Sequence, residues 1–246
     1  MVDLVVGDLM PLDILLAAIT AFCAAVVLAL AFYLSKRGVP RWQSRKMVHI
    51  SMGTVIAFTI FNYDNLTGPI FAAGLFMIVL MYAWAHNSKL ITDLLSAGSR
   101  DGETRLNTFA SGFMGVLSFA IVFLVFYSRP EIFVAAILAV AWGDAAGEVV
   151  GGPFGGRVIK QRFHNKSVEG SLAVLVFTTL SIVVSLLTYS PDTNIALVIP
   201  QILLVALAAS IAEILSIGWT DNFLIPMVTA LAMWLLLFPS VPLFPL

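Results

Sequence analysis

The sequence predicts an all-α protein: a polytopic bundle of transmembrane helices with about eight crossings of the bilayer. Of the 246 residues, 60% are hydrophobic and only 11% are charged, whereas soluble domains carry about 25% charged residues. Seven apolar stretches each approach the roughly 20 residues that are needed to cross the hydrocarbon of a bilayer. Lysine and arginine gather in alternate connections between these stretches, as multi-pass topologies require.

The seven apolar stretches define the expected crossings in order along the chain. They lie at about residues 12–34, 68–85, 108–127, 132–150, 171–189, 196–215 and 223–239. A shorter stretch at 47–61 is expected to cross as the eighth, because the alternation of the loops requires it; without it the count is seven. Three aspartates near the start argue against a cleaved secretory leader, which begins with positive charge. We expect residues 1–246 to form a single integral membrane domain.

The basic residues orient the bundle. With the N-terminus outside, the connections 35–46, 86–107, 151–170 and 216–222 all face the cytoplasm, and together they hold every lysine and arginine except Arg129. The polar machinery of the chain is therefore expected at the cytoplasmic face of the membrane. The net charge of −1 argues against nucleic acid as a partner.

The densest polar motif runs from Gly143 to Ser171. Within it, Asp144 and Glu148 are four residues apart and share a helix face. Two carboxylates there repel each other and are costly inside a membrane, and magnesium (Mg2+), which prefers oxygen ligands, relieves both problems. We also expect the helix to end just beyond them, where its dipole favours a cation. An ion pair with a basic residue of the next loop is the alternative.

Glycines accompany these acids. Gly143, Gly147 and Gly151 are spaced by four residues, and Gly155 follows. The spacing allows the close approach of either a ligand or another helix, and the sequence leaves both interpretations open.

The connection from 151 to 170 then supplies cations. Lys160 and Lys166 lie among glycine, asparagine and serine, and Ser167 precedes the next helix. The free N–H groups of a helix N-terminus favour phosphate, and Ser167 also suits an ordinary N-cap. The alternative to phosphate binding is the positive-inside rule, which by itself accounts for lysines in a cytoplasmic loop. No Walker-type Gly-x-x-x-x-Gly-Lys-Ser/Thr motif occurs in the sequence, so any phosphate is bound by another construction.

Two further clusters are expected at the same membrane face. Arg45 and Lys46 precede His49, which either donates to phosphate, shuttles a proton or is structural. Glu213 lies near the end of one apolar stretch, where a solvent-facing acid is the simpler alternative to a ligand. Asp221 begins the next stretch, where it serves as a metal ligand or as a helix cap.

Together, three motifs resemble the polyprenol kinase family, which includes dolichol, phytol and farnesol kinases and the CTP-dependent diacylglycerol kinase, and which is related to the CDP-diacylglycerol synthases. The first motif is Arg-Lys-x-x-His-x-x-x-Gly at 45–53, and the second is the central Gly-Asp signature from 143 to 171. The third is Glu…Asp-Asn…Pro from 213 to 226. The segment 151–155 lacks the basic residue that the family often carries there.

This resemblance implies transfer of a phosphoryl group to the hydroxyl of a membrane lipid alcohol, with CTP as the usual donor and magnesium as the required cofactor. The metal ligands that it implies are Asp144, Glu148, Asp221 and Glu213. The residues that it implies at the nucleotide phosphates are Lys160, Lys166, Ser167, Arg45, Lys46, Gly147, Gly151 and Gly155. The expected catalytic residues are His49 and an acid, Asp144 or Asp221, that takes the alcohol proton.

Two other functions stay open. A cytidylyltransferase that forms a CDP-activated lipid would use the same metal and phosphate site but direct attack at the α-phosphate. A transporter would place polar residues near the midplane, often in inverted repeats, and no such repeat is visible in the sequence. The identity of the lipid alcohol and the formation of a homo-oligomer are likewise open.

Overall fold

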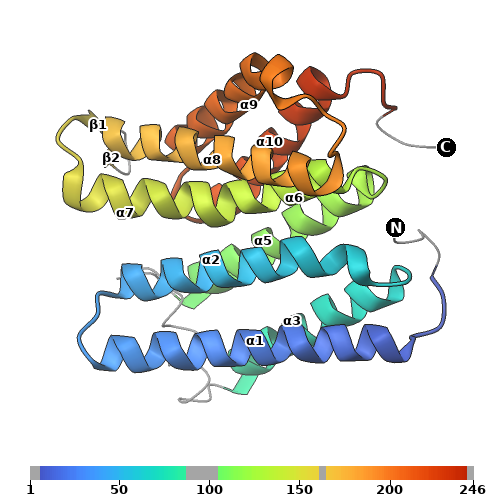
Figure 1. The fold of residues 1–246 in the computed structure, drawn as a ribbon. Coiled ribbons are helices and arrows are strands. Elements are labelled where there is room, and N and C mark those ends of the chain that lie inside the picture. The colour runs from blue at the N-terminus through green and yellow to red at the C-terminus, as the bar shows by residue number, and fades with distance from the viewer. Residues whose placement is uncertain (1–5, 87–104, 161–164, 243–246) are drawn as a thin grey trace. The chain divides into compact units, whose positions relative to one another are not determined.

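The computed structural model describes residues 6–86, 105–160 and 165–242 (Figure 1). They fall into two compact units, Met1–Phe113 and Met114–Leu246, which are considered one at a time. Helices predominate in both, so the prediction of an all-α helical bundle is confirmed. A short two-stranded hairpin in the second unit is the departure from it among the described residues.

The first unit is built from antiparallel helices. Its elements are α1 (Pro11–Lys36), α2 (Arg41–Thr59), the 3-10 turn η1 (Ile60–Asn62), α3 (Thr67–His86) and the beginning of α5 (Arg105–Phe126). Helix α1 packs against both α2 and α3. Asp13, in the first turn of α1, is fully buried and accepts hydrogen bonds from the backbone N–H groups of Met10 (3.1 Å) and Asp64 (3.3 Å). This carboxylate therefore joins the start of α1 to the connection that precedes α3.

Helix α2 begins earlier than its apolar stretch. The connection from α1 is only a few residues long, because Gly38 adopts a left-handed turn (φ +88°) and Pro40 occupies the N-cap of α2. Arg45 and Lys46, expected in the loop before the helix, consequently lie inside it. Both side chains are buried.

The second unit surrounds one long central helix. Its elements after α5 are α6 (Pro130–Leu138), the π-helical turn η2 (Ala139–Asp144), α7 (Ala145–Phe154), β1 (Val158–Lys160), β2 (Asn165–Ser167), α8 (Val168–Tyr189), α9 (Ile195–Leu215), the 3-10 turn η3 (Gly218–Thr220) and α10 (Asp221–Leu237). The run α6–η2–α7 is continuous and packs against α8 and α10, while α9 packs on both α8 and α10 (Figure 1). Its residues 132–139 are fully buried, which is why its sequence is apolar on every side.

Four helices of the described residues are long and apolar enough to cross a membrane. They are Pro11–Lys36, Pro130–Phe154, Val168–Tyr189 and Ile195–Leu215. Shorter apolar helical segments at Thr67–Ile78, Ala110–Phe126 and Asp221–Leu237 match three more of the expected crossings. A membrane helix bundle is thus supported, and the number of eight crossings, like the single domain, stays a prediction.

The glycine row of the central helix forms the contact with α8. A Cβ atom at Gly147 would lie 2.7 Å from Cγ2 of Val174, and one at Gly151 would lie 2.7 Å from Oγ of Ser167. From the opposite side, a Cβ at Gly170 would lie 2.7 Å from the carbonyl oxygen of Gly147. Of the two interpretations of this row, close helix packing is therefore the one that the geometry supports directly, because α8 occupies the space beside these glycines.

We predict that Gly170→Ala destabilises the protein, because its methyl group meets helix backbone on α7 and not a flexible side chain. Overpacking of this kind costs about 1–3 kcal/mol, measurable as a lower midpoint of thermal unfolding in detergent. Gly152→Ala is the matched control, since nothing lies within 4 Å of its added Cβ. Equal unfolding midpoints for the two variants would show that the helices do not depend on this close approach.

Candidate functional site

An ion pair joins the central motif to the late motif. Lys166 is in β2 and Glu213 is near the end of α9, and Nζ of the lysine contacts Oε1 of the glutamate. The lysine side chain is 23% exposed, whereas the glutamate side chain is only 6% exposed. Glu213 is therefore not the solvent-facing acid that its position at a helix end allowed. Residues 47 positions apart in the sequence meet at this end of the unit.

Two hydrogen bonds fix the start of α8 at the same place. Ser167 is the N-cap of α8, and its Oγ accepts from the N–H of Gly170 at 3.1 Å. The buried Ser210 of α9 donates from its Oγ to the carbonyl oxygen of Ser171 at 2.8 Å. The predicted cap is confirmed, and α8 and α9 are held in register beside the Lys166–Glu213 pair.

Asp144 lies inside the bundle. It is the last residue of the π-helical turn η2 and is only 5% exposed. The helix continues through α7 to Phe154, so the expectation that it ends just beyond Glu148 was wrong. The helix dipole therefore does not favour a cation at Asp144 and Glu148, since a helix dipole acts mainly on the last turn of the helix. Glu148, one turn further along α7, is half-buried.

Asp221 is also buried, at 2% exposure, as the first residue of α10. The N-cap position belongs to Thr220, and the Asp221 carboxylate instead accepts from the N–H of Asn222 at 2.8 Å. The carbonyl oxygen of Asn222 in turn accepts from Oγ of Ser118 in α5 at 2.8 Å. The start of α10 is thus attached to α5 within the second unit.

Packing places Asp144 and Asp221 at the same level of the bundle. Ile225 of α10 lies in one buried cluster with Ala139 and Val140 of η2. Asp221 is one turn before Ile225, and Asp144 is about one turn after Ala139 and Val140. Because α10 and the central helix run in opposite directions, both steps lead toward the hairpin end of the unit. The two buried carboxylates therefore lie at one depth on neighbouring elements.

The Lys166–Glu213 pair lies closer to the hairpin than these two acids. A Cβ at Gly143 would lie 2.7 Å from Oγ1 of Thr178, which places Asp144 at about the level of Thr178. Thr178 is about ten residues into α8, or about 15 Å along the helix axis from its start beside Lys166. From the hairpin inward, the order is thus the lysine pair, then Glu148, and then the two buried aspartates.

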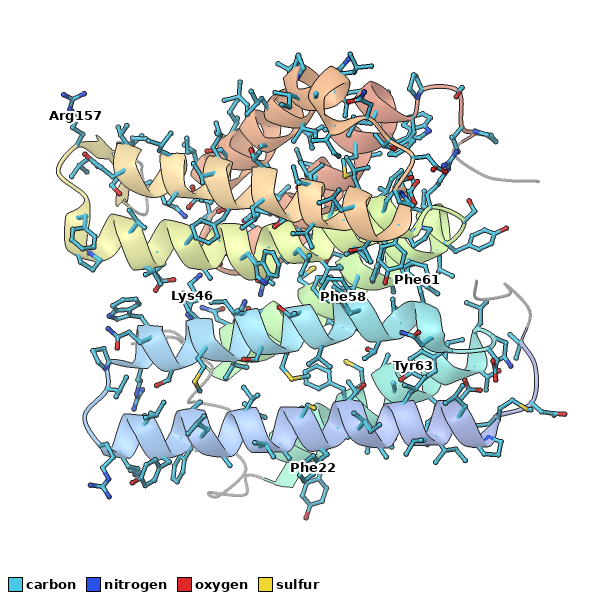
Figure 2. The ribbon with its side chains drawn as sticks, in the orientation of Figure 1. Phe22, Lys46, Phe58, Phe61, Tyr63 and Arg157 are labelled. Atoms are coloured by element: carbon cyan, nitrogen blue, oxygen red, sulfur yellow. The ribbon has the colours of Figure 1, made fainter. Side chains whose placement is uncertain are left out.

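A two-stranded hairpin connects α7 to α8 at this end of the unit. Strands β1 and β2 pair antiparallel, with Lys160 opposite Asn165 and Ile159 opposite Lys166. Arg157, before β1, points away from the helices (Figure 2), and its backbone N–H donates to the Glu169 carboxylate at 3.3 Å. The connection between α7 and α8, expected as a loop, is therefore partly an ordered hairpin.

The remaining expected residues lie elsewhere in the chain. Arg45, Lys46 and His49 are on α2 in the first unit, where His49 is half-buried; Figure 2 labels Lys46. Three basic residues of the expected cytoplasmic loops lie outside the described residues: Lys89, Arg100 and Arg162.

The donor set suits a hard divalent cation. Asp144 and Asp221 supply carboxylates at one depth, and buried carboxylates require a compensating positive charge. Within residues 6–86, 105–160 and 165–242, no three acidic, histidine or cysteine side chains come together as a preformed metal cluster. Magnesium binding by the two buried aspartates and Glu148 therefore stays a prediction.

Sequence reasoning missed three features that position these residues. Ser118 and Ser210 are single serines within apolar helices, and the only signal for them is their polarity in a membrane segment, where side-chain hydroxyls join helices. The π-helical turn before Asp144 has no recognisable sequence signal, although such turns are frequent at functional sites.

Two curated proteins are similar to this chain over most of its length. A phytol kinase of Synechocystis is 26% identical over 231 residues, which cover 92% of each chain. The chain is thus similar to this phytol kinase along nearly its whole length. A probable chloroplastic phytol kinase 1 of Oryza sativa subsp. japonica is 25% identical over 227 residues, covering 89% of this chain and 72% of its own. The polyprenol kinase family that the three motifs indicated is thereby supported. No family model matches the chain, and no solved structure matches it significantly.

We predict that Ser167→Ala lowers the free energy of unfolding by about 1 kcal/mol, because α8 loses its side-chain N-cap. The midpoint of thermal unfolding in detergent measures it. Ser190→Ala, at the other end of α8, is the matched control, since Ser190 bonds to Leu186 through its backbone N–H. An unchanged midpoint for Ser167→Ala would mean that the cap contributes nothing to the stability of α8.

Proposed function

We propose that this protein is a kinase that transfers the γ-phosphoryl group of CTP to the hydroxyl of a membrane lipid alcohol at the cytoplasmic face. The observation that carries the proposal is the pair of buried aspartates, Asp144 and Asp221, at one depth of a bundle whose outer end carries Lys166. The similarity to two phytol kinases supports a prenyl-type alcohol such as phytol as the acceptor.

Lys166 lies nearer the hairpin end of the bundle and the two aspartates lie deeper. This order suits two substrates that arrive from different phases. A nucleotide comes from water and meets the lysine first, whereas a long-chain alcohol enters from the lipid. A nucleotide that enters along the bundle axis from the hairpin end would pass Lys166 first and present its γ-phosphate toward the aspartates. Positioning and charge neutralisation supply most of the catalysis in phosphoryl transfer.

The proposed roles follow from these positions. Asp144 and Asp221, with Glu148 one turn along α7, would hold magnesium, and the bound ion would neutralise charge on the phosphate oxygens. Lys166 and Ser167, at the start of α8, contact the triphosphate, where the positive end of the helix dipole favours phosphate. A further phosphate contact is proposed for the basic residue Lys160 of β1.

In the reaction, the alcohol oxygen bonds to the γ-phosphorus and the bond from this phosphorus to the bridging oxygen breaks, which releases CDP. The alcohol proton passes to a carboxylate of Asp144 or Asp221. Both aspartates are shielded from water by their burial, which strengthens their interaction with the reacting groups.

The test is direct. Purified protein is incubated with magnesium, each nucleoside triphosphate in turn and a panel of lipid alcohols, and the products are identified by mass. A lipid monophosphate with CDP supports the kinase. A CDP-lipid with pyrophosphate would instead identify a cytidylyltransferase, and uptake of solute into proteoliposomes without nucleotide would identify a transporter.

We predict that Asp144→Asn lowers transfer from labelled CTP by about 100-fold or more, because the site loses a charge that acts on the reacting phosphate. The same variant should keep its thermal unfolding midpoint within a few degrees. Asp8→Asn, at an exposed position near the N-terminus, is the control and should retain full activity. Wild-type turnover by Asp144→Asn would remove this residue from the site.

We further predict that Arg157→Cys, in a Cys23→Ser background, is labelled by a membrane-impermeant thiol reagent only from the cytoplasmic side. Arg157 is exposed at the hairpin (Figure 2), where the basic connection is expected inside. Asp192→Cys, between α8 and α9, should be labelled only from outside. The reverse pattern would overturn the topology and move the site to the other face.

A further inference from the structure

The two side chains of the Lys166–Glu213 pair differ in solvent exposure, which suggests that the two residues have different roles. The carboxylate side of the pair is 6% exposed and the ammonium side is 23% exposed. A buried carboxylate is stable as an ion only beside a positive charge. An ammonium group has three N–H donors, so one contact with Glu213 leaves capacity for other acceptors on the exposed side.

Both partners are attached to rigid elements. The Glu213 carbonyl oxygen accepts from the N–H of Ser216 at 3.2 Å and from its Oγ at 2.7 Å, at the C-cap of α9. Lys166 is paired with Ile159 in the hairpin and directly precedes Ser167, the N-cap of α8. The pair therefore fixes a normally flexible lysine side chain next to the N-cap of α8.

We infer that Glu213 is a positioning residue for Lys166, and that it holds the ammonium group ready for a phosphate of the incoming nucleotide. This inference rests on the proposed kinase function and gives Glu213 a role other than metal binding. A lysine that is already held in place loses less rotamer freedom when phosphate binds. Glu213 thus acts on nucleotide affinity through Lys166 and contacts neither the metal nor the transferred group.

The test compares nucleotide and magnesium dependence in single and double variants. Glu213→Gln is expected to raise the KM for CTP about 10-fold, with kcat within about threefold of wild type and an unchanged magnesium concentration for half-maximal rate. Lys166→Met is expected to raise the KM at least as much. Glu131→Gln changes an equally buried glutamate, which pairs with Arg129 at the start of α6; it is the matched control and should leave the KM unchanged.

The double variant Lys166→Met/Glu213→Gln decides between roles. If Glu213 acts only through Lys166, the double variant has the KM of Lys166→Met alone. It replaces the pair with neutral side chains of similar size, which proteins commonly tolerate, so it remains informative even if Glu213→Gln alone does not fold. Conservative Lys166→Arg should restore most of the nucleotide affinity that Lys166→Met loses.

Other outcomes overturn the inference. If the increase in KM in the double variant equals the product of the increases in the two single variants, Glu213 acts independently of Lys166. A loss of turnover in Glu213→Gln as large as that expected for Asp144→Asn, or a higher magnesium requirement, would make Glu213 a metal ligand. Failure of the proposed function is distinguishable from both, because the wild-type protein itself would then produce no lipid monophosphate from CTP.

Discussion

The close approach of α7 to α8 is the constraint on which the candidate site depends. In a bilayer, apolar side chains gain little by leaving lipid for another helix, so helices associate through close packing and hydrogen bonds. Gly147, Gly151 and Gly170 provide that packing, because a methyl group at any of them would lie 2.7 Å from atoms of the opposite helix or its N-cap. The contact sets the register of the two helices, and with it the depth of Asp144 relative to Lys166.

The hydrogen bonds and the ion pair extend this register to the other helices. Ser210 attaches α9 to the start of α8, Glu213 reaches Lys166, and Ser118 reaches the start of α10. Each contact satisfies a polar group that would be costly in hydrocarbon. The first two lie at the hairpin end of the second unit, and the third lies at the depth of the two aspartates. The polar groups that join the helices and the groups proposed for chemistry are thus neighbours, and the same packing supports both.

Much of this arrangement is predictable from local patterns. Apolar stretches of about 20 residues predicted the helices, and the bounds differ mostly by a few residues, because hydrophobic length is a strong local signal. Ser167 was predictable as a cap from its residue type and position. The secondary structure from Gly147 to Lys166 was harder to predict, because α7 continues to Phe154 and a hairpin follows. Glycine-rich segments are compatible with both helix and loop, and only the packing against α8 selects between them.

The sequence by itself determined the membrane character, the approximate helices, the acidic and basic motifs and the likeness to polyprenol kinases, because these depend on composition and local spacing. Only the tertiary structure decided which charges meet. It paired Lys166 with Glu213, buried Asp221 at the depth of Asp144, and placed the lysine pair nearer the hairpin than either aspartate. Such contacts depend on helix register, which arises from side chains and glycines far apart in the chain and leaves no local pattern to read.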